Sequence, residues 1–176
     1  MLKEELHTKC GNIIHVSQKA QRHLAAHPDV ENLLEEAVSK LALPTDNSGF
    51  CRQEICLGRI IGTNNCVKTP PINGLMNATF AIRSGRNVAS RVVVGVKKPK
   101  CDIVSIMAYK CQGKWHLVTA YIGPLAPREP HDPSLRNDPR ALAESMNFWC
   151  CHALVYDNTW STPFTATWQQ IVCNAP

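Results

Sequence analysis

The fold class of this protein follows from the stretch Ile103-Val-Ser-Ile-Met-Ala-Tyr-Lys-Cys-Gln-Gly-Lys-Trp-His-Leu-Val-Thr-Ala-Tyr-Ile122. Its two halves, 103–109 and 115–122, are rich in Val, Ile and aromatic residues, which is the composition of β-strands. The segment between them contains Gly113, a residue type that hairpin loops favour. The stretch therefore predicts a β-hairpin.

Further short runs of the same composition occur on both sides of the hairpin. Turn residues such as Pro70-Pro71 and Ser84-Gly85 separate them. We expect these runs to join the hairpin in one mostly antiparallel sheet, with strands at 55–61, 78–82, 91–96, 103–109, 115–122 and 151–156.

Two helices are predicted before the sheet. Ser17 can cap a helix over 18–27, and Pro28 can open a second helix at its first turn. In the second helix, 29–41, apolar residues recur at helical spacing and form one stripe. Helices followed by strands indicate an α+β protein, with the N-terminal helices packed on one face of an antiparallel β-sheet.

The chain length predicts a single domain, because about 150 residues is typical of one domain. We expect this domain to span residues 1–176, with a helical part at 12–43, a sheet at 55–157 and a packed tail at 158–176. Five prolines within 124–140 predict a long loop without a helix or a central strand, and 141–149 predicts a short helix.

The composition excludes several classes of protein. With 44% hydrophobic and 19% charged residues, the chain has enough apolar material for a core and too little charge for a disordered protein. No apolar run reaches the ~18 residues that span a bilayer, and the first residues do not resemble a secretory signal. The nine cysteines, an odd number without a CxxC pair, are interpreted as reduced thiols, mostly small core residues, of a cytoplasmic protein.

Positive charge is concentrated in residues 83–114, which hold eight Lys or Arg residues and one acid. The rest of the chain holds 11 basic and 13 acidic residues. Such a stretch can bind the phosphates of a polyanion. It is equally typical of a solvated sheet edge, where lysines block aggregation, so both interpretations stay open.

Two histidines, His23 and His27, lie four residues apart on the first predicted helix. They therefore share one face of that helix, together with Lys19. Such a pair can bind zinc, or one imidazole can transfer a proton while the other binds phosphate. A structural role is also open, because His27 precedes Pro28 and can cap the end of the helix.

Polar residues on the predicted strands supply further groups for acid–base catalysis. Thr119 and Tyr121 alternate along one strand and so share a face, and His152 begins another strand. Together with a histidine on a helix, these groups suit cleavage of a phosphodiester. A base takes the proton of the ribose 2′-hydroxyl, an acid protonates the leaving 5′-oxygen, and a cation stabilises the phosphorane.

Three segments resemble phage-associated nucleases of the barnase–EndoU–colicin–RelE superfamily. Residues 12–30, Asn-Ile-Ile-His-Val-Ser-Gln-Lys-Ala-Gln-Arg-His-Leu-Ala-Ala-His-Pro-Asp-Val, resemble the opening strand, capped helix and His-Pro turn of that group. Leu117-Val-Thr-Ala-Tyr121 is similar to its Thr-x-Tyr strand end. The block 145–154, Ser-Met-Asn-Phe-Trp-Cys-Cys-His-Ala-Leu, resembles the helix-to-strand segment of the toxin members. The likeness covers residues 12–157 in outline, and the insert after the Thr-x-Tyr strand is a departure from it.

This resemblance implies a metal-independent endoribonuclease, without a cofactor, that serves as a toxin or effector of a phage or mobile element. RNA, often tRNA, is the implied substrate, and an antitoxin or immunity protein is the implied partner. The implied catalytic residues are His23, His152, Thr119, Tyr121, His27 and Arg91. The implied substrate-binding residues are Arg83, Lys97, Lys98, Arg128 and Ser145. Among these, His23 and His152 would transfer protons, Thr119 and Tyr121 would orient phosphate or base, and Arg91 or Arg83 would stabilise phosphate.

Other functions stay open. Arg128 and Glu129 stand between two prolines and are either a phosphate-binding arginine with an alternative base or a surface salt bridge. A non-catalytic module that binds nucleic acid or a host protein would depend on its lysines rather than its histidines. Cys150 shares a strand face with His152 and could act as a thiol nucleophile. A zinc site built from His23, His27 and a cysteine is a third alternative.

Overall fold

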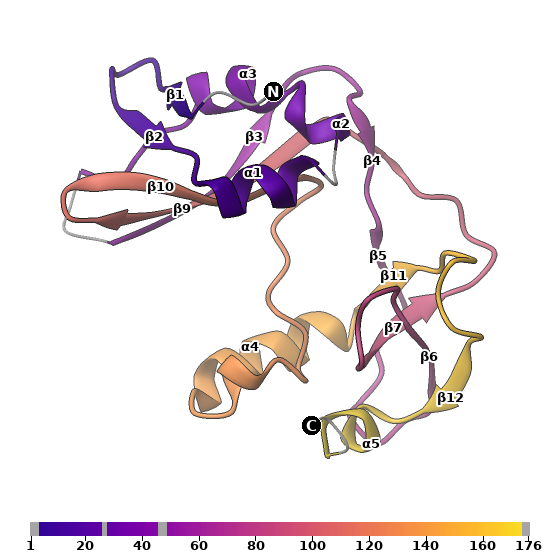
Figure 1. Cartoon of the computed structure of the whole chain (residues 1–176). Helices are drawn as coiled ribbons and strands as arrows, with labels where there is room; N and C mark the ends of the chain where they lie inside the picture. Colours follow the sequence, from indigo (N-terminus) through magenta and orange to yellow (C-terminus); the bar gives the residue numbers. More distant parts are fainter. Residues whose placement is uncertain (1–3, 26–27, 46–48, 174–176) are drawn as a thin grey trace. The chain divides into compact units, whose positions relative to one another are not determined.

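The computed structural model describes residues 4–25, 28–45 and 49–173, and of His23 and Pro28 it describes the backbone. The chain divides into two compact units, which are described one at a time (Figure 1). Unit 1 consists of Met1–Asn64 and Lys100–Leu125. Unit 2 consists of Asn65–Pro99 and Ala126–Pro176. In the described ranges, no helix is long and apolar enough to cross a membrane.

Unit 1 is built on a five-stranded sheet with the strand order β1-β2-β10-β9-β3. Its strands are β1 (Glu5–His7), β2 (Ile13–His15), β3 (Phe50–Cys56), β9 (Ile103–Cys111) and β10 (Lys114–Ile122). The predicted hairpin is confirmed as β9 and β10, which pair antiparallel. Its turn, Gln112-Gly113, has φ angles of 49° and 78°, the left-handed region that a tight hairpin turn requires. The pairing of β10 with β2 is parallel, and the other pairings of this sheet are antiparallel.

Three helices cover one face of this sheet. They are α1 (Gln18–Ala25), α2 (Pro28–Glu31) and α3 (Leu34–Ser39). The Ser17 hydroxyl accepts a hydrogen bond from the Ala20 amide at 3.2 Å, which confirms the predicted cap. Leu24 and Leu34 pack in one buried cluster with Ile106 from the sheet. A further pair of short strands, β4 (Gly62–Thr63) and β8 (Lys100–Cys101), completes unit 1.

Unit 2 has its own five-stranded sheet, with the order β12-β6-β7-β11-β5. Its strands are β5 (Cys66–Lys68), β6 (Ala78–Ile82), β7 (Ala89–Val93), β11 (His152–Val155) and β12 (Phe164–Ala166). The unit also contains η1 (Pro133–Leu135), α4 (Pro139–Trp149) and α5 (Trp168–Cys173). Its core is formed around Phe80, Trp149 and Trp168. The predicted helix at 141–149 is confirmed as α4, whose first turn is capped by the Asp138 carboxylate.

The protein is of mixed α and β structure, but the prediction of N-terminal helices packed on one antiparallel sheet is wrong. The strands belong to three sheets, and each five-stranded sheet includes one parallel pairing, β10 with β2 and β11 with β7. The physical reason is that alternation along a chain identifies a strand without identifying its partner. The runs at 78–82 and 91–96 therefore look like neighbours of the hairpin in sequence, although they pair in unit 2.

Candidate functional site

A groove in unit 1 is the best-formed setting for the predicted chemistry. Its volume is about 510 Å³. The start of α1 and the middle of the β9–β10 hairpin line it, with Ser17, Lys19, Ala20, Tyr109, Leu117, Val118 and Thr119. Three of these residues, Ser17, Lys19 and Thr119, carry polar side chains that suit a phosphate ligand.

A β-bulge in β10 shapes one wall of this groove. Leu117 pairs with Ala108 and Thr119 pairs with Met107, so Val118 is the extra residue on the bulged strand. Because of the bulge, Leu117 is buried on the helix-covered face, whereas Thr119 lies on the opposite face. The bulge therefore changes which face of the sheet the residues after Val118 occupy, and it places Thr119 in the lining of the groove.

Helix α1 forms the other wall. β2 pairs with β10 only at Trp115 and His116, and α1 packs along the part of β10 that follows. Lys19 lies in the first turn of α1, and its exposed side chain lines the groove. His23 follows Lys19 by four residues, about one helical turn further along the same face. The side chain of His23 and the whole of His27 lie outside the described residues, so the structure gives no geometry for either imidazole.

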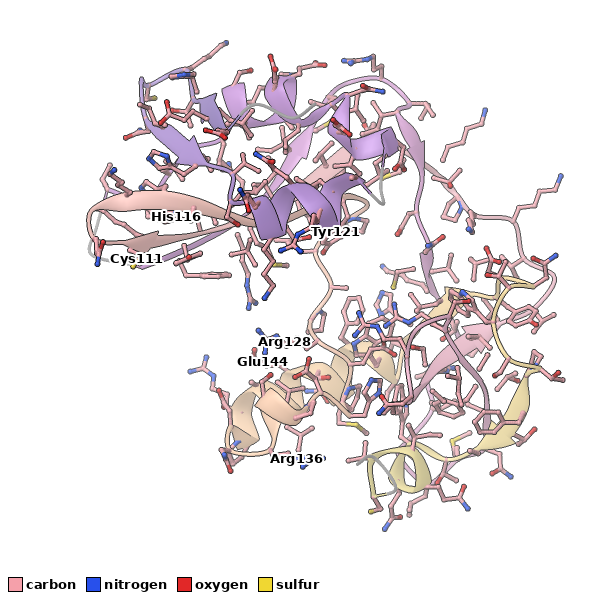
Figure 2. All side chains as sticks on the ribbon, viewed as in Figure 1. Cys111, His116, Tyr121, Arg128, Arg136 and Glu144 are labelled. Atoms are coloured by element: carbon pink, nitrogen blue, oxygen red, sulfur yellow. The ribbon has the colours of Figure 1, made fainter. Side chains whose placement is uncertain are left out.

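The remaining predicted residue of this unit, Tyr121, lies two residues after Thr119 on the same face of β10. It pairs with Ser105 across the sheet, whereas Thr119 pairs with Met107. Figure 2 shows Tyr121 and His116 at two different positions along the hairpin. Thr119 and Tyr121 are therefore neighbours on one face, as the alternation predicts, and both are half-buried.

Next to the groove, the same face of the sheet carries histidine and aromatic side chains. The His116 ring stacks on the Tyr109 ring at 5.2 Å and lies 5.5 Å from the His15 ring. Tyr109 also lines the groove. This cluster has no signature in the sequence, because its members come from three strands and meet only through the pairing of β2, β10 and β9.

The other predicted site residues belong to unit 2, and Arg91 among them is buried. Its guanidinium donates to the backbone carbonyls of Cys150 at 2.9 Å, Trp149 at 3.1 Å and Pro70 at 3.3 Å. The first two carbonyls lie at the C-terminal end of α4, where carbonyl groups lack partners within the helix. In this structure Arg91 therefore ties the end of α4 to the sheet of unit 2.

His152 begins β11 and stacks on Phe148, with ring centroids 3.9 Å apart and an angle of 3° between the rings. Its Nδ1 lies 2.8 Å from the Phe148 carbonyl oxygen. That contact requires a proton on Nδ1, which leaves Nε2 as the nitrogen that can accept a proton. The ring is therefore held in one orientation and one tautomer.

Ser145 and Arg128 meet where the proline-rich segment crosses α4. The buried Ser145 hydroxyl donates to the Arg128 carbonyl at 2.6 Å, and the Trp149 indole nitrogen donates to the same carbonyl at 3.2 Å. The exposed Arg128 guanidinium contacts the Ser134 hydroxyl and the Asp132 carboxylate. Figure 2 shows Arg128 beside α4, on which Glu144 is also labelled.

The two lysines that are predicted to bind substrate, Lys97 and Lys98, lie after β7. Lys98 pairs with Asp157, with its Nζ 3.6 Å from the carboxylate, and Lys97 is exposed. The stretch 83–114 itself divides between the units, with 83–99 in unit 2 and 100–114 in unit 1.

A partly buried ion pair joins Arg83 and Glu129 in unit 2. The Arg83 guanidinium donates to Glu129 at 2.6 Å, and the Glu129 side chain is 8% exposed. A cavity of about 240 Å³ lies next to the pair, with Arg83, Arg86 and His131 in its lining. Burial lowers the pKa of His131, although the Glu129 carboxylate opposes that shift. Glu129 is thus part of a buried pair with Arg83, and it does not form the predicted surface bridge with Arg128.

Two thiols of unit 2, those of Cys66 and Cys150, have weak nucleophilic character. Burial raises the pKa of Cys150, and burial together with the Glu129 charge raises the pKa of Cys66 to about 11. Such thiols stay protonated near neutral pH, whereas a thiolate is the reactive form. Within the described ranges, no three His, Cys, Asp or Glu side chains gather as metal ligands would. In the comparisons with known proteins, no family model, curated protein or solved structure matches this chain.

Proposed function

We propose that the protein is a metal-independent endoribonuclease that cleaves RNA through attack of a ribose 2′-hydroxyl. The observation that supports this function best is the groove of unit 1. Lys19 and Thr119 line the same cavity there, and His23 lies one helical turn after Lys19. A cation and a hydroxyl that line one cavity, with a histidine position further along the same helix, suit a phosphodiester substrate.

The proposed reaction follows from these groups. His23 takes the proton of the 2′-hydroxyl, and the 2′-oxygen then attacks the adjacent phosphorus. The bond from phosphorus to the 5′-oxygen breaks, and an acid gives that oxygen a proton. Lys19 and the Thr119 hydroxyl stabilise the charge that develops on the phosphorane oxygens. The products are a 2′,3′-cyclic phosphate and a 5′-hydroxyl.

The resemblance also implies that His152 of unit 2 is a proton-transfer group, and it is a candidate separate from the groove of unit 1. Proton donation by this ring would require both nitrogens to be protonated, with Nδ1–H donating to the Phe148 carbonyl and the proton on Nε2 available for transfer. The His152→Ala variant tests this assignment separately from that of His23.

A ribonuclease that serves as a toxin must be restrained in the cell that makes it. The proposal therefore includes a neutralising protein partner and a role in the conflict between a phage or mobile element and its host. The substrate in this proposal is cellular RNA, with tRNA as the first class to examine.

The first experiment is incubation of the purified protein with total RNA in the presence of EDTA, read on a sequencing gel. We expect discrete cleavage that His23→Ala reduces by at least about a hundredfold, as general acid–base groups typically contribute. His7→Ala is the matched control, because His7 is an exposed histidine of unit 1 on β1. A substrate with a 2′-deoxy sugar at the cleavage site should resist cutting. Equal cutting of that substrate would exclude the mechanism.

The second candidate is a module that binds RNA without cleaving it. The half-buried His15 and His116 and the exposed Tyr109 ring beside the groove favour this alternative, because such side chains bind bases. Binding of RNA by the wild type and by His23→Ala, with no cleavage by either, would select this function.

A further inference from the structure

One residue from each strand of the unit 1 sheet lies in a single row across it. The pairings are Glu5 with His15, His15 with His116, His116 with Tyr109, and Tyr109 with Phe50. The row runs from β1 through β2, β10 and β9 to β3 on the face opposite to the helices. We call these five residues the cross-sheet row.

Contacts along the row hold its rings in place. The Glu5 carboxylate lies 3.4 Å from His15 Nδ1, and the His15 and His116 ring centroids are 5.5 Å apart. His116 in turn stacks on Tyr109, with centroids 5.2 Å apart and an angle of 26° between the rings. A side chain supported in this way loses little conformational entropy when it binds a ligand.

The far end of the row remains open to solvent. Tyr109 and Phe50 are each 42% exposed, although residues on the opposite face of the same strands, such as Ile106, are fully buried. The Arg52 guanidinium lies 5.2 Å from the centroid of the Phe50 ring. Exposed aromatic rings interleaved with cations are typical of surfaces that bind single-stranded nucleic acid.

Tyr109 links the row to the groove, since it belongs to both. A base stacked on the open part of the Tyr109 ring would therefore bring its sugar and phosphate toward the cavity that Lys19 and Thr119 line. Acidic residues lie on both faces of this sheet: Glu35 and Glu36 belong to α3 on the opposite face, whereas Glu5 is part of the row and Glu54 is exposed on β3. Exposed aromatic rings beside the Arg52 and Lys19 cations favour a nucleic acid over an acidic protein as the ligand of the row.

We propose that the cross-sheet row is a base-stacking site for single-stranded RNA, in which one unpaired base stacks on Tyr109 beside Phe50. This inference rests on the proposed ribonuclease function and names its substrate as unpaired RNA. Histidine and glutamate at the other end support the stack, so that Tyr109 presents a rigid ring surface.

Binding can be measured without cleavage, using a fluorescein-labelled 2′-O-methyl oligouridine of twelve residues as the probe. Its 2′-oxygens carry no proton to remove, so the proposed reaction cannot cut it. In fluorescence anisotropy we expect Tyr109→Ala and Tyr109→Leu to raise the Kd at least about tenfold, the range measured for loss of one stacked base. Tyr109→Phe should keep wild-type affinity, because it retains the ring. A probe of abasic residues and a twelve-base-pair RNA duplex should both bind more weakly.

Phe164→Ala is the matched control, because Phe164 is 40% exposed on β12 of unit 2 and does not belong to the row. Thermal unfolding of each variant shows whether a higher Kd comes from lost folding. Tyr109→Leu with wild-type stability and wild-type affinity would overturn the stacking site, as would equal binding of the abasic probe.

The same variants separate this inference from the proposed function. Cleavage of unmodified RNA with no dependence on the Tyr109 ring would retain the ribonuclease and overturn the stacking site. Binding that depends on the Tyr109 ring, together with no cleavage in the EDTA experiment, would retain the stacking site and overturn the ribonuclease.

Discussion

At the scale of single residues, the least expected feature is the buried pair of Arg83 and Glu129. A carboxylate with 8% exposure is costly to bury, and the guanidinium at 2.6 Å compensates for the lost hydration. The pair also borders His131. The Glu129 carboxylate raises the pKa of His131, and the Arg83 guanidinium lowers it. Both charged side chains therefore contribute to the fold of unit 2, with or without a ligand in the adjoining cavity.

Removal of the Glu129 charge should destabilise unit 2. We expect Glu129→Gln to lower the free energy of unfolding by about 1–3 kcal/mol, less than for a fully buried pair because Arg83 is partly exposed. Urea unfolding measures this change. The control is Glu144→Gln, which breaks the exposed Arg140–Glu144 pair and should cost less than about 0.5 kcal/mol. Equal effects of the two substitutions would contradict the burial argument.

His131 should make the stability of the protein depend on pH. Burial lowers its pKa below the ordinary 6.5, so below pH 6.5 the unfolded chain binds a proton more readily than the folded one. The contribution of His131 to the free energy of unfolding should therefore fall as the pH drops from about 6.5 toward the folded pKa. Above about pH 6.5 this contribution should stay constant. Urea unfolding at pH 7 and pH 5 should show a smaller pH effect in His131→Gln than in the wild type. Asp132, whose pKa is lowered from 3.8, titrates below this window.

Thiol reactivity provides another check at this scale. Cys66 has a pKa of about 11, so its thiolate is scarce at pH 8, whereas Cys10 and Cys111 are exposed. Brief treatment with iodoacetamide at pH 8 and peptide mass spectrometry should show modified Cys10 and Cys111 and unmodified Cys66. Rapid modification of Cys66 in the folded protein would contradict its raised pKa.

At the scale of elements, the junction of α4 and β11 depends on one side chain from another strand. Arg91 extends from β7 to the carbonyls of Trp149 and Cys150, at the point where the helix ends. From the sequence, Arg91 is a candidate for stabilising a phosphate. The folded chain instead uses its guanidinium to satisfy backbone acceptors that no other residue of α4 can reach.

Substitution of Arg91 should therefore affect folding more than catalysis. We expect Arg91→Met to lower the free energy of unfolding by about 3 kcal/mol, because it removes the donor to the carbonyls of Trp149 and Pro70, whereas the Cys150 carbonyl keeps its bond from the Ile72 amide. Arg91→Lys should recover part of this loss, since one ammonium replaces only some of the contacts. Urea unfolding measures both, and cleavage per folded molecule should stay at the wild-type rate.

At the scale of the whole molecule, each unit has its own hydrophobic core. The cluster around Ile106 and Leu34 contains residues of unit 1, and the cluster around Phe80 and Trp168 contains residues of unit 2. The chain passes from one unit to the other three times, near residues 64, 99 and 125. Each core is therefore assembled from segments that are distant in sequence.

A cavity in one core should weaken that unit first. Ile106→Ala removes a fully buried side chain, at a cost of about 2–5 kcal/mol. Hydrogen exchange measured by mass spectrometry should show faster exchange in β9, β10 and β3, with β6 and β7 initially retaining their protection. Phe80→Ala should give the reverse pattern. Simultaneous loss of protection in both sheets would contradict two separate cores.

The sequence by itself determined the features that depend on nearby residues. The hairpin of β9 and β10, the Ser17 cap of α1 and the helix α4 follow from periodicity, turn residues and caps, whose physical causes act over a few positions. The placement of Thr119 and Tyr121 on one face follows in the same way from alternation along a strand.

Only the tertiary structure decided which strands pair and what their side chains meet. The division into two units, the carbonyl partners of Arg91 and the row from Glu5 to Phe50 all arise from contacts between distant segments. The reason is that backbone hydrogen bonding between strands is nearly independent of side-chain identity. Partner and register are therefore selected by the packing of the completed core, and the groove and the cross-sheet row form only when that packing is complete.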